Sequence, residues 1–229
     1  MRTLVLWDVD LTLVDMRPVR GRWLHRAVLE VTGRELTDVP RMAGRTDRWI
    51  ARELLAGVDV APTDALIGRL YEVAVREAGG ERERMAALGI VLPGVEDVLR
   101  KIAGMDDVAQ TLVTGNVRPI ARYKVGAFGL DQYLDLEIGG YGDSSEDRSV
   151  LVADALAGAR NRHGVSFAGE SAVVVGDTPH DVAGALAQGA RAVGVATGDY
   201  SADDLRTAGA HAVLPDLGDT AEALAAILP

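Results

Sequence analysis

Short apolar runs alternate with amphipathic stretches along most of this chain, and this alternation predicts its secondary structure. Runs of four to seven apolar residues between polar or glycine-rich segments are typical of buried strands, whereas apolar residues that recur every three or four positions predict helices. Strands that alternate with helices favour an α/β fold with a parallel sheet and right-handed crossovers. We expect strands at residues 4–7, 109–116, 133–140, 171–177 and 191–197, and a short sixth at 211–216.

One long stretch interrupts this alternation. Residues 16–90 contain no convincing strand, and Gly33, Gly57 and Thr63 stand where helix ends are expected, the glycines as C-caps and the threonine as an N-cap. A helical block directly after one strand is not a simple βαβ crossover, so we expect an inserted all-helical domain. Within it we expect helices at 23–33, 48–57, 63–80 and 81–89, and after it helices at 91–104, 117–129, 148–164, 181–190 and 219–228.

Composition narrows the classes of protein that fit this pattern. The 229 residues are 48% hydrophobic and contain no cysteine, which excludes disulfides and thiolate chemistry. The net charge of −10 argues against non-specific nucleic-acid binding, because a phosphate backbone requires a positive surface. No basic and apolar leader and no apolar run near 18 residues is present, so we expect a cytoplasmic protein without a membrane partner.

The first expected strand ends in two carboxylates. Asp8 and Asp10 follow the apolar run 4–7, and the C-terminal edge of a parallel sheet is where ligands bind. Two carboxylates at this spacing fit a nucleophile with a proton-handling partner, or two ligands of a hard metal ion. An Asx-turn that closes the strand accounts for them equally well when this stretch is taken alone.

Polar residues also end two other expected strands. Thr114, Gly115 and Asn116 end the second strand, and Asp177, with Asp181 four residues later, ends the fourth. In a parallel sheet these ends converge, and several carboxylates in one place repel one another unless a cation lies among them. Oxygen ligands without cysteine or clustered histidine indicate Mg²⁺. The Thr114 hydroxyl and the amides beside Gly115 can hold phosphate oxygens.

With these segments in view, the chain resembles the haloacid dehalogenase (HAD) superfamily of phosphohydrolases. The resemblance rests on DVDLT at 8–12, LVTGN at 112–116 and GDTPHDV at 176–182, in this order and each at a strand end. It implies a Rossmann-like α/β core built from residues 1–15 and 91–229. The helical block, residues 16–90, matches the inserted cap of phosphoglycolate-phosphatase-like members.

The resemblance implies a role for each motif residue. Asp8 is similar to the nucleophile that forms an aspartyl-phosphate, and Asp10 to the general acid and base, whose backbone carbonyl also binds magnesium. Thr114 resembles the phosphate-binding residue of the family, beside Gly115 and Asn116. Asp177 resembles a direct metal ligand and Asp181 an outer-sphere ligand.

The chain departs from the family pattern at two positions. Leu11 stands where relatives usually have glycine, which leaves the local turn geometry open. The family also uses one cation, often lysine, to neutralise the phosphate and the nucleophile, and Arg148 occupies that place here. Lys124 is the alternative cation, although as a residue within an expected helix it is better explained by a structural role.

The loop at Gly44, Arg45 and Thr46 has the pattern with which related caps reach over the active site, so Arg45 is a candidate substrate-binding residue. The resulting hypothesis is a Mg²⁺-dependent phosphatase for a small phosphorylated metabolite, acting as a monomer or homodimer. A phosphomutase of the same superfamily remains open. A dehalogenase is less consistent with Asp10, and a non-catalytic binding protein is less consistent with the intact motif set.

Overall fold

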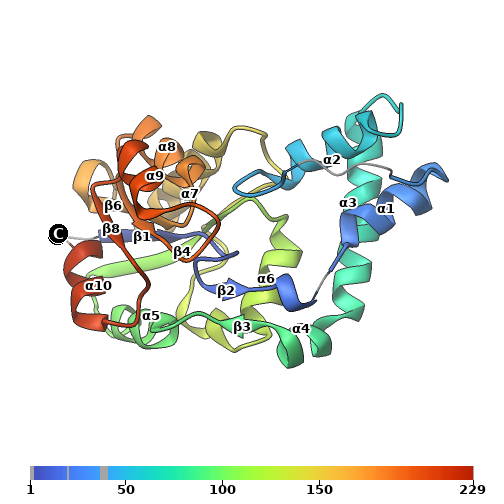
Figure 1. Ribbon diagram of the computed structural model, residues 1–229. Coiled ribbons are helices and arrows are strands. Elements are labelled where there is room, and N and C mark those ends of the chain that lie inside the picture. Colours follow the sequence, from blue (N-terminus) through green and yellow to red (C-terminus); the bar gives the residue numbers. More distant parts are fainter. Residues whose placement is uncertain (1–2, 20, 37–40, 229) are drawn as a thin grey trace.

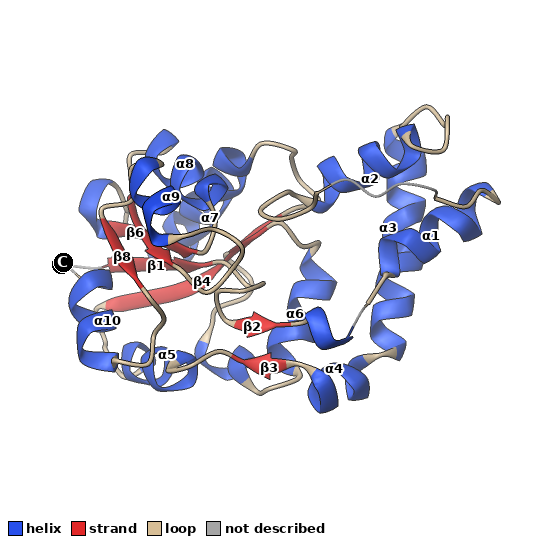
Figure 2. Cartoon of the chain, viewed as in Figure 1, coloured by secondary structure: helices blue, strands red, loops and turns tan. Residues whose placement is uncertain are grey.

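The computed structural model describes residues 3–19, 21–36 and 41–228, and it confirms the expected α/β class. A six-stranded parallel sheet in the order β5-β4-β1-β6-β7-β8 lies beside a group of helices from the first half of the chain (Figures 1 and 2). No described helix has the length and apolar character needed to cross a membrane. The strands are β1 (Thr3–Trp7), β4 (Val108–Thr114), β5 (Gly140–Tyr141), β6 (Ala172–Gly176), β7 (Arg191–Val195) and β8 (Ala212–Leu214).

The central strand β1 is fully buried and pairs in parallel with β4 on one side and β6 on the other. Its side chains alternate between two cores, with Val5 and Trp7 in one and Leu4 and Leu6 in the other. A strand buried on both faces requires a continuous apolar run, which is why this segment was identifiable in the sequence. The register places Trp7 beside Leu112 and Val175, so all three strands end at the same edge.

Helices cover both faces of the sheet. The core that contains Val5 and Trp7 also holds apolar residues of α5 (Val95–Ala103), α6 (Arg118–Gly126) and α10 (Thr220–Ile227). The opposite core is formed with α7 (Arg148–His163), α8 (Pro179–Ala187) and α9 (Ala202–Thr207). This arrangement places the N-terminal ends of α6, α7 and α8 near the edge where β4, β1 and β6 end.

The inserted block is helical, as expected. It comprises α1 (Trp23–Thr32), α2 (Asp47–Ala56), α3 (Asp64–Gly80) and α4 (Arg82–Leu88). Gly33 caps α1 in the left-handed conformation, and the Thr63 hydroxyl caps α3, both as predicted. A two-stranded antiparallel pair, β2 (Val14–Asp15) and β3 (Ile90–Val91), joins the two segments that lead into and out of these helices.

Four expectations about individual elements were wrong or incomplete. Residues 133–140 alternate between buried and exposed side chains but do not form a strand, because Asp135 accepts a hydrogen bond from the Glu137 amide and turns the chain; only Gly140–Tyr141 pairs with β4. Helix α5 starts at Val95 rather than near residue 91, since 90–91 belong to β3. Helix α9 and the β2–β3 pair were not predicted.

A loop of the helical block rests directly on the sheet edge. The Asp47 amide donates to the Gly115 carbonyl at 2.6 Å, and the Arg48 amide donates to the Gly142 carbonyl at 3.0 Å. The approach is so close that a Cβ on Gly115 would lie 2.2 Å from the Arg45 carbonyl oxygen. We call residues 42–47 the cap loop.

Asp47 fixes this loop with its side chain as well. Its Oδ2 accepts a hydrogen bond from the Val117 amide at 2.8 Å. Burial raises the pKa of Asp47 from 3.8 to about 6, with the Val117 bond and Lys124 opposing the shift. Because the pKa is raised in the folded state, ionisation of Asp47 costs stability as the pH rises from about 4 through about 6.

We therefore expect the difference in the free energy of unfolding, Asp47→Asn minus wild type, to increase by about 2 kcal/mol when the pH is raised from about 4.5 to about 8. The asparagine oxygen can still accept the Val117 hydrogen bond but carries no charge. Urea unfolding at both pH values measures the difference. Asp106 is exposed, and Asp106→Asn is the matched control, whose difference from wild type in the free energy of unfolding should be the same at both pH values. If the difference for Asp47→Asn is also the same at both pH values, the prediction is contradicted.

Candidate active site

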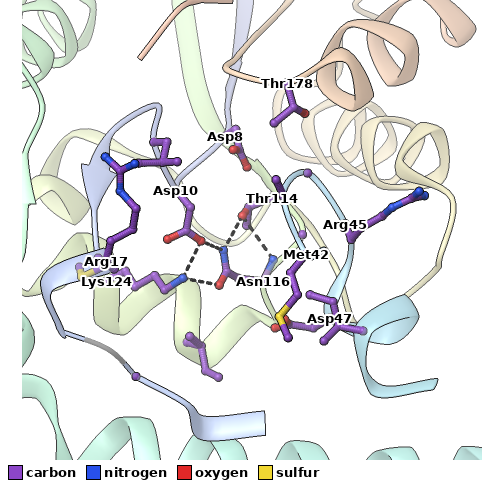
Figure 3. Close-up of a pocket in the computed structure, with 18 of the residues that line it drawn as sticks. Asp8, Asp10, Arg17, Met42, Arg45, Asp47, Thr114, Asn116, Lys124 and Thr178 are labelled. Carbon is purple, nitrogen blue, oxygen red and sulfur yellow. Dashed lines mark hydrogen bonds and ion pairs between the residues drawn. The ribbon is translucent and has the colours of Figure 1, made fainter. Parts of the chain in front are cut away.

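The predicted motif residues except Asp181 line one cavity of about 460 Å³ between the sheet edge and the cap loop. Figure 3 shows Asp8, Asp10 and Thr114 at the centre of this cavity, with Met42 and Asp47 opposite them. The parallel register of β1, β4 and β6 accounts for the convergence, because each motif follows directly after one of these strands. The cavity lining includes the motif and cap-loop candidates Asp8, Asp10, Gly44, Arg45, Thr114, Gly115, Asn116, Lys124, Arg148 and Asp177.

Asp8 is held between the sheet and a buried arginine. Its amide donates to the Val175 carbonyl at 2.9 Å, and its Oδ1 accepts from Arg148 Nη2 at 2.6 Å. Burial raises the pKa of Asp8 to about 7; Arg148 opposes this shift, and Asp181 and Asp10 add to it. The carboxylate therefore has one oxygen fixed by the guanidinium, and the structure brings together the nucleophile and cation candidates of the sequence.

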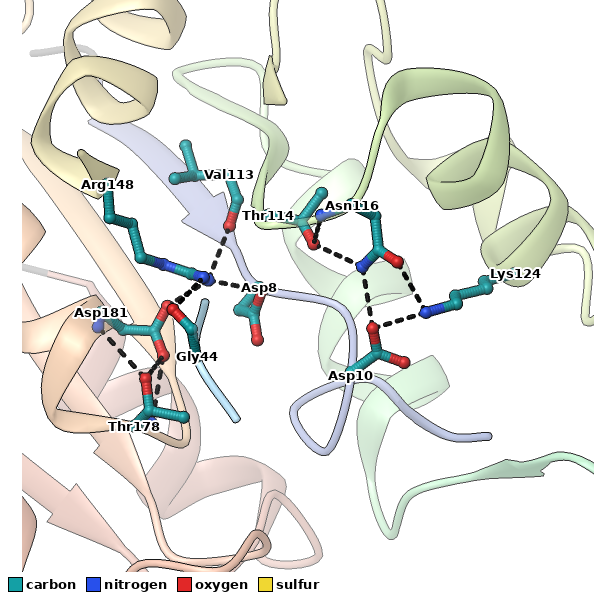
Figure 4. A network of polar contacts seen from close by, with 10 residues as sticks. All are labelled: Asp8, Asp10, Gly44, Val113, Thr114, Asn116, Lys124, Arg148, Thr178 and Asp181. Carbon is teal, nitrogen blue, oxygen red and sulfur yellow. Dashed lines mark hydrogen bonds and ion pairs between the residues drawn. The ribbon is translucent and has the colours of Figure 1, made fainter. Parts of the chain in front are cut away.

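Arg148, the first residue of α7, contacts four segments, one of which is β4, where its Nη2 donates to the Val113 carbonyl at 3.5 Å. Besides Asp8, its Nη2 lies 2.5 Å from Asp181 Oδ1, and its Nη1 donates to the Gly44 carbonyl at 3.2 Å. Figure 4 draws these contacts around the guanidinium. A planar guanidinium can reach several acceptors in different directions, which a lysine ammonium at this position could not do equally well.

Asp8, Asp177 and Asp181 form a buried carboxylate cluster. One oxygen from each can be chosen so that all three lie within 4.8 Å of one another. Burial, together with Asp8 and Asp181, raises the pKa of Asp177 to about 9. Its buried Oδ1 has no hydrogen-bond partner among the described residues. Three carboxylates around one guanidinium leave excess negative charge and an orphaned oxygen, a donor set that fits a hard divalent cation such as Mg²⁺.

A turn at the start of α8 fixes the side chain of Asp181. Its Oδ2 accepts from the Thr178 amide at 3.0 Å and from the Thr178 hydroxyl at 2.7 Å, in a capping box at the start of α8. One oxygen is thereby committed to the helix N-terminus, and the other faces Arg148. This arrangement is compatible with the outer-sphere role that the resemblance implies.

Asp10 is separate from the carboxylate cluster. Its Oδ2 accepts from Asn116 Nδ2 at 2.8 Å and from Lys124 Nζ at 2.6 Å (Figure 4). Asn116 also donates to the Thr114 hydroxyl at 2.9 Å and accepts from Lys124 at 2.7 Å. The side chain of Asp10 thus contacts β4 and α6 rather than the carboxylate cluster, and the metal role that the resemblance implies belongs to its main-chain carbonyl.

The turn after Asp10 accommodates Leu11 in a left-handed conformation. Leu11 has φ of +60°, the region that glycine adopts without a Cβ penalty. Its amide donates to the Val14 carbonyl at 2.8 Å, and its carbonyl accepts from the Thr197 hydroxyl. A leucine in this conformation costs about 1 kcal/mol of backbone strain. The two hydrogen bonds help to keep the turn in this conformation. The backbone therefore has the conformation for which glycine is suited.

The cap-loop candidates take different positions. The Gly44 carbonyl contacts Arg148, and a Cβ at Gly44 would lie 2.6 Å from the Thr178 hydroxyl oxygen. The Arg45 guanidinium stacks on Trp49 at 4.6 Å and points away from Asp8 (Figure 3). The Thr46 hydroxyl accepts from the Trp49 amide as the N-cap of α2. Of these three candidates, Gly44 and Arg45 line the cavity, whereas the Thr46 side chain caps α2.

Sequence reasoning missed several residues of the cavity wall, among them Asp47 and Trp23. Asp47 lies in the cavity wall, and its only signal was its place directly after a helix-capping threonine. Trp23 also lines the cavity, and its ring lies 5.9 Å from Lys124 Nζ. In the sequence, the apolar neighbours of Trp23 indicated only a packing role for this residue. Lys124 itself, expected to be structural, is buried with its ammonium in the site.

Comparisons with known proteins agree with this geometry. A model of the HAD-hydrolase-like family matches residues 147–220. No curated protein sequence matches the chain significantly.

Solved structures share the fold over nearly the whole length. A hydrolase from Pseudomonas syringae is 20% identical, with all of both chains covered and a TM-score of 0.69. A predicted phosphatase from Clostridium acetobutylicum is 17% identical over 98% of this chain and 99% of its own, with a TM-score of 0.65. A predicted phosphoglycolate phosphatase from Haemophilus somnus is 18% identical over 97% of each chain, with a TM-score of 0.63. Residues 147–220 are thus similar to HAD-like hydrolases, and the chain as a whole has the same kind of fold as these solved structures.

Proposed function

We propose that this protein is a Mg²⁺-dependent phosphatase that hydrolyses a small phosphorylated metabolite through a phosphoryl group carried on Asp8. The observation that carries the proposal is the separation of two carboxylates at one strand end. Asp8 lies in the carboxylate cluster beside Arg148, whereas Asp10 is held apart by Asn116 and Lys124. Two neighbouring carboxylates in different environments fit two different chemical roles.

In this mechanism the free oxygen of Asp8 attacks phosphorus while the bond to the leaving oxygen breaks. Asp10, as a carboxylic acid, gives its proton to the leaving alcohol, and the resulting carboxylate then takes a proton from the water that attacks the aspartyl-phosphate. As the water oxygen bonds to phosphorus, the bond from Asp8 to phosphorus breaks, which releases phosphate and restores the Asp8 carboxylate. Asp8, Asp177, the Asp10 carbonyl and, through water, Asp181 would hold Mg²⁺. The ion supplies charge neutralisation for the approach of an anionic carboxylate to an anionic phosphate.

The phosphate would bind between Asp8 and the end of β4. Thr114 offers its hydroxyl, and the backbone beside Gly115 and Asn116 offers amides, while Arg148 keeps a positive charge against the nucleophile. Arg45 would enter only if its side chain left Trp49. The cavity volume of about 460 Å³ is compatible with a small metabolite and gives no reason to expect a nucleic-acid substrate.

Asp8→Asn should lower phosphate release by at least about 1,000-fold, because an amide oxygen is a far weaker nucleophile than a carboxylate. A panel of p-nitrophenyl, sugar and carboxylic-acid phosphates with Mg²⁺ provides the assay, and phosphate release distinguishes a hydrolase from a mutase, which yields an isomeric ester. Asp106→Asn is the matched control and keeps full activity. Activity of Asp8→Asn near the wild-type level would remove Asp8 as the nucleophile.

The covalent intermediate has its own signature. When an alcohol such as glycerol is added as a competing acceptor, the ratio of free phosphate to transferred phosphate should be the same for p-nitrophenyl and sugar phosphates, since both pass through the same aspartyl-phosphate. Product analysis of the two reactions measures this ratio. A ratio that changes with the leaving group indicates direct attack by water and excludes the intermediate.

Mg²⁺ should raise the melting temperature of the wild-type protein, and Asp177→Asn should abolish the increase. A ligand that binds only the folded state stabilises it by mass action. The pKa values of about 7 for Asp8 and about 9 for Asp177 mean that the metal-free folded state retains protons that the unfolded chain has lost. Stability without metal therefore falls as the pH rises from about 6 to 9, and the Mg²⁺ effect grows.

Thermal melts at about pH 6 and about pH 9, each with Mg²⁺ or with a chelator, measure this effect. Asp106→Asn again serves as the control and responds to Mg²⁺ like the wild type. A Mg²⁺ response that persists in Asp177→Asn would place the metal elsewhere.

A further inference from the structure

Lys124 is one of only two lysines in the chain, which has 24 lysine and arginine residues in total. The other, Lys101, is exposed on α5, whereas Lys124 is buried on α6 with an exposed fraction of 6%. Burial of an ammonium is costly unless it is paired and hydrogen-bonded. The partners of Lys124 therefore indicate what this residue does.

The ammonium of Lys124 has two acceptors and one aromatic neighbour. It donates to Asp10 Oδ2 at 2.6 Å and to Asn116 Oδ1 at 2.7 Å, and the Trp23 ring of α1 lies 5.9 Å away. The Asn116 amide group in turn donates to the same Asp10 oxygen at 2.8 Å. Lys124, Asn116 and Asp10 thus form a closed triangle in which each side chain contacts the other two.

This triangle fixes one oxygen of Asp10 and leaves the other. Both donors bind Oδ2, so Oδ1 is the oxygen left to hold a proton. The Asp10 side chain is 41% exposed, so without these donors its carboxylate would have several orientations open to it. Lys124 also fixes the Asn116 side-chain amide. Its hydrogen bond to Asn116 Oδ1 directs the NH₂ group of Asn116 toward Asp10 and Thr114.

The position of Lys124 argues against direct phosphate binding. Figure 4 draws it on the far side of Asp10 from Asp8, with Asn116 between Lys124 and Thr114. The cation beside the nucleophile is Arg148, whose Nη2 contacts both Asp8 and Asp181. The two cations therefore serve different carboxylates.

We propose that Lys124 is a positioning residue for proton transfer, which orients the Asp10 carboxyl group toward the leaving oxygen of the substrate. The inference rests on the proposed phosphatase function. In the transfer step the bond between phosphorus and the leaving oxygen breaks, a bond from Asp8 to phosphorus forms, and the Asp10 proton moves to the leaving oxygen. Lys124 contacts neither the substrate nor the reacting atoms and acts through Asp10.

The test uses two esters of similar size that differ in their need for a proton. p-Nitrophenolate leaves without protonation, whereas the alkoxide from benzyl phosphate requires it. kcat/KM reports the steps up to the release of this leaving group. Lys124→Met keeps an unbranched side chain, one atom shorter, and removes its charge and donors.

For Lys124→Met with Mg²⁺ we expect kcat/KM for benzyl phosphate to fall by about 10- to 100-fold, within the usual range for general acid catalysis, and that for p-nitrophenyl phosphate by less than about threefold. Lys101→Met is the matched control and leaves both values unchanged. Lys124→Arg should restore the benzyl rate only in part, because a guanidinium does not fit the compact site between Asp10 and Asn116. Melting temperatures identify any variant that is merely unfolded.

Each outcome bears on a different statement. Equal losses on both esters in a folded variant, or no loss on either, would overturn the positioning role while the wild-type activity sustains the phosphatase proposal. A wild-type protein that hydrolyses neither ester, nor any member of the substrate panel, overturns the phosphatase proposal and this inference together. A selective loss on benzyl phosphate supports both.

Discussion

The site depends on one buried guanidinium among three carboxylates. Arg148 contacts Asp8 at the end of β1 and Asp181 on α8, and its other nitrogen reaches Gly44 of the cap loop. A buried ion pair of this kind gives little net stability, because the loss of hydration offsets the Coulomb attraction. Its effect is geometric, since it fixes the sheet edge, two helices and the cap loop relative to one another.

One guanidinium does not neutralise three carboxylates, and the excess negative charge contributes to the raised pKa values of two of them. The pKa values of Asp8 and Asp177 are raised because burial and mutual repulsion disfavour their charged forms. Such a set is unfavourable as a purely structural element. It is favourable when a divalent cation and a phosphate complete the charge balance, which is why the cluster supports a phosphoryl-transfer site.

The sequence was most informative where one physical cause dominates. Fully buried strands need continuous apolar runs, and helix ends need caps, so β1, β6, Gly33 and Thr63 were all predictable. The segment 133–140 was not, because its alternating burial belongs to an irregular chain that Asp135 turns. The β2–β3 pair is two residues long on each side and lacks any local signal, since it depends on the geometry of the insertion.

The same limit applies within the site. Motif residues at strand ends could be placed at one edge from the parallel topology alone, which brought Asp8, Thr114 and Asp177 together. The environment of Asp10 could not be predicted, because Lys124 reaches it from the middle of a helix whose periodicity indicates only packing. Asp47 was missed for a similar reason, since its partner is a main-chain amide on Val117.

The choice of cation at each carboxylate follows from the number of acceptors around it. Around Arg148 the acceptors come from separate segments: Nη2 contacts Asp8 after β1 and Asp181 on α8, and Nη1 reaches the Gly44 carbonyl of the cap loop. Around Lys124 two acceptors lie close together, and a compact ammonium satisfies both from one atom. The arginine beside Asp8 and the lysine beside Asp10 are therefore not interchangeable. Compared with the lysine that the resemblance implies at this position, Arg148 keeps a positive charge beside Asp8 and also contacts Asp181 and the Gly44 carbonyl.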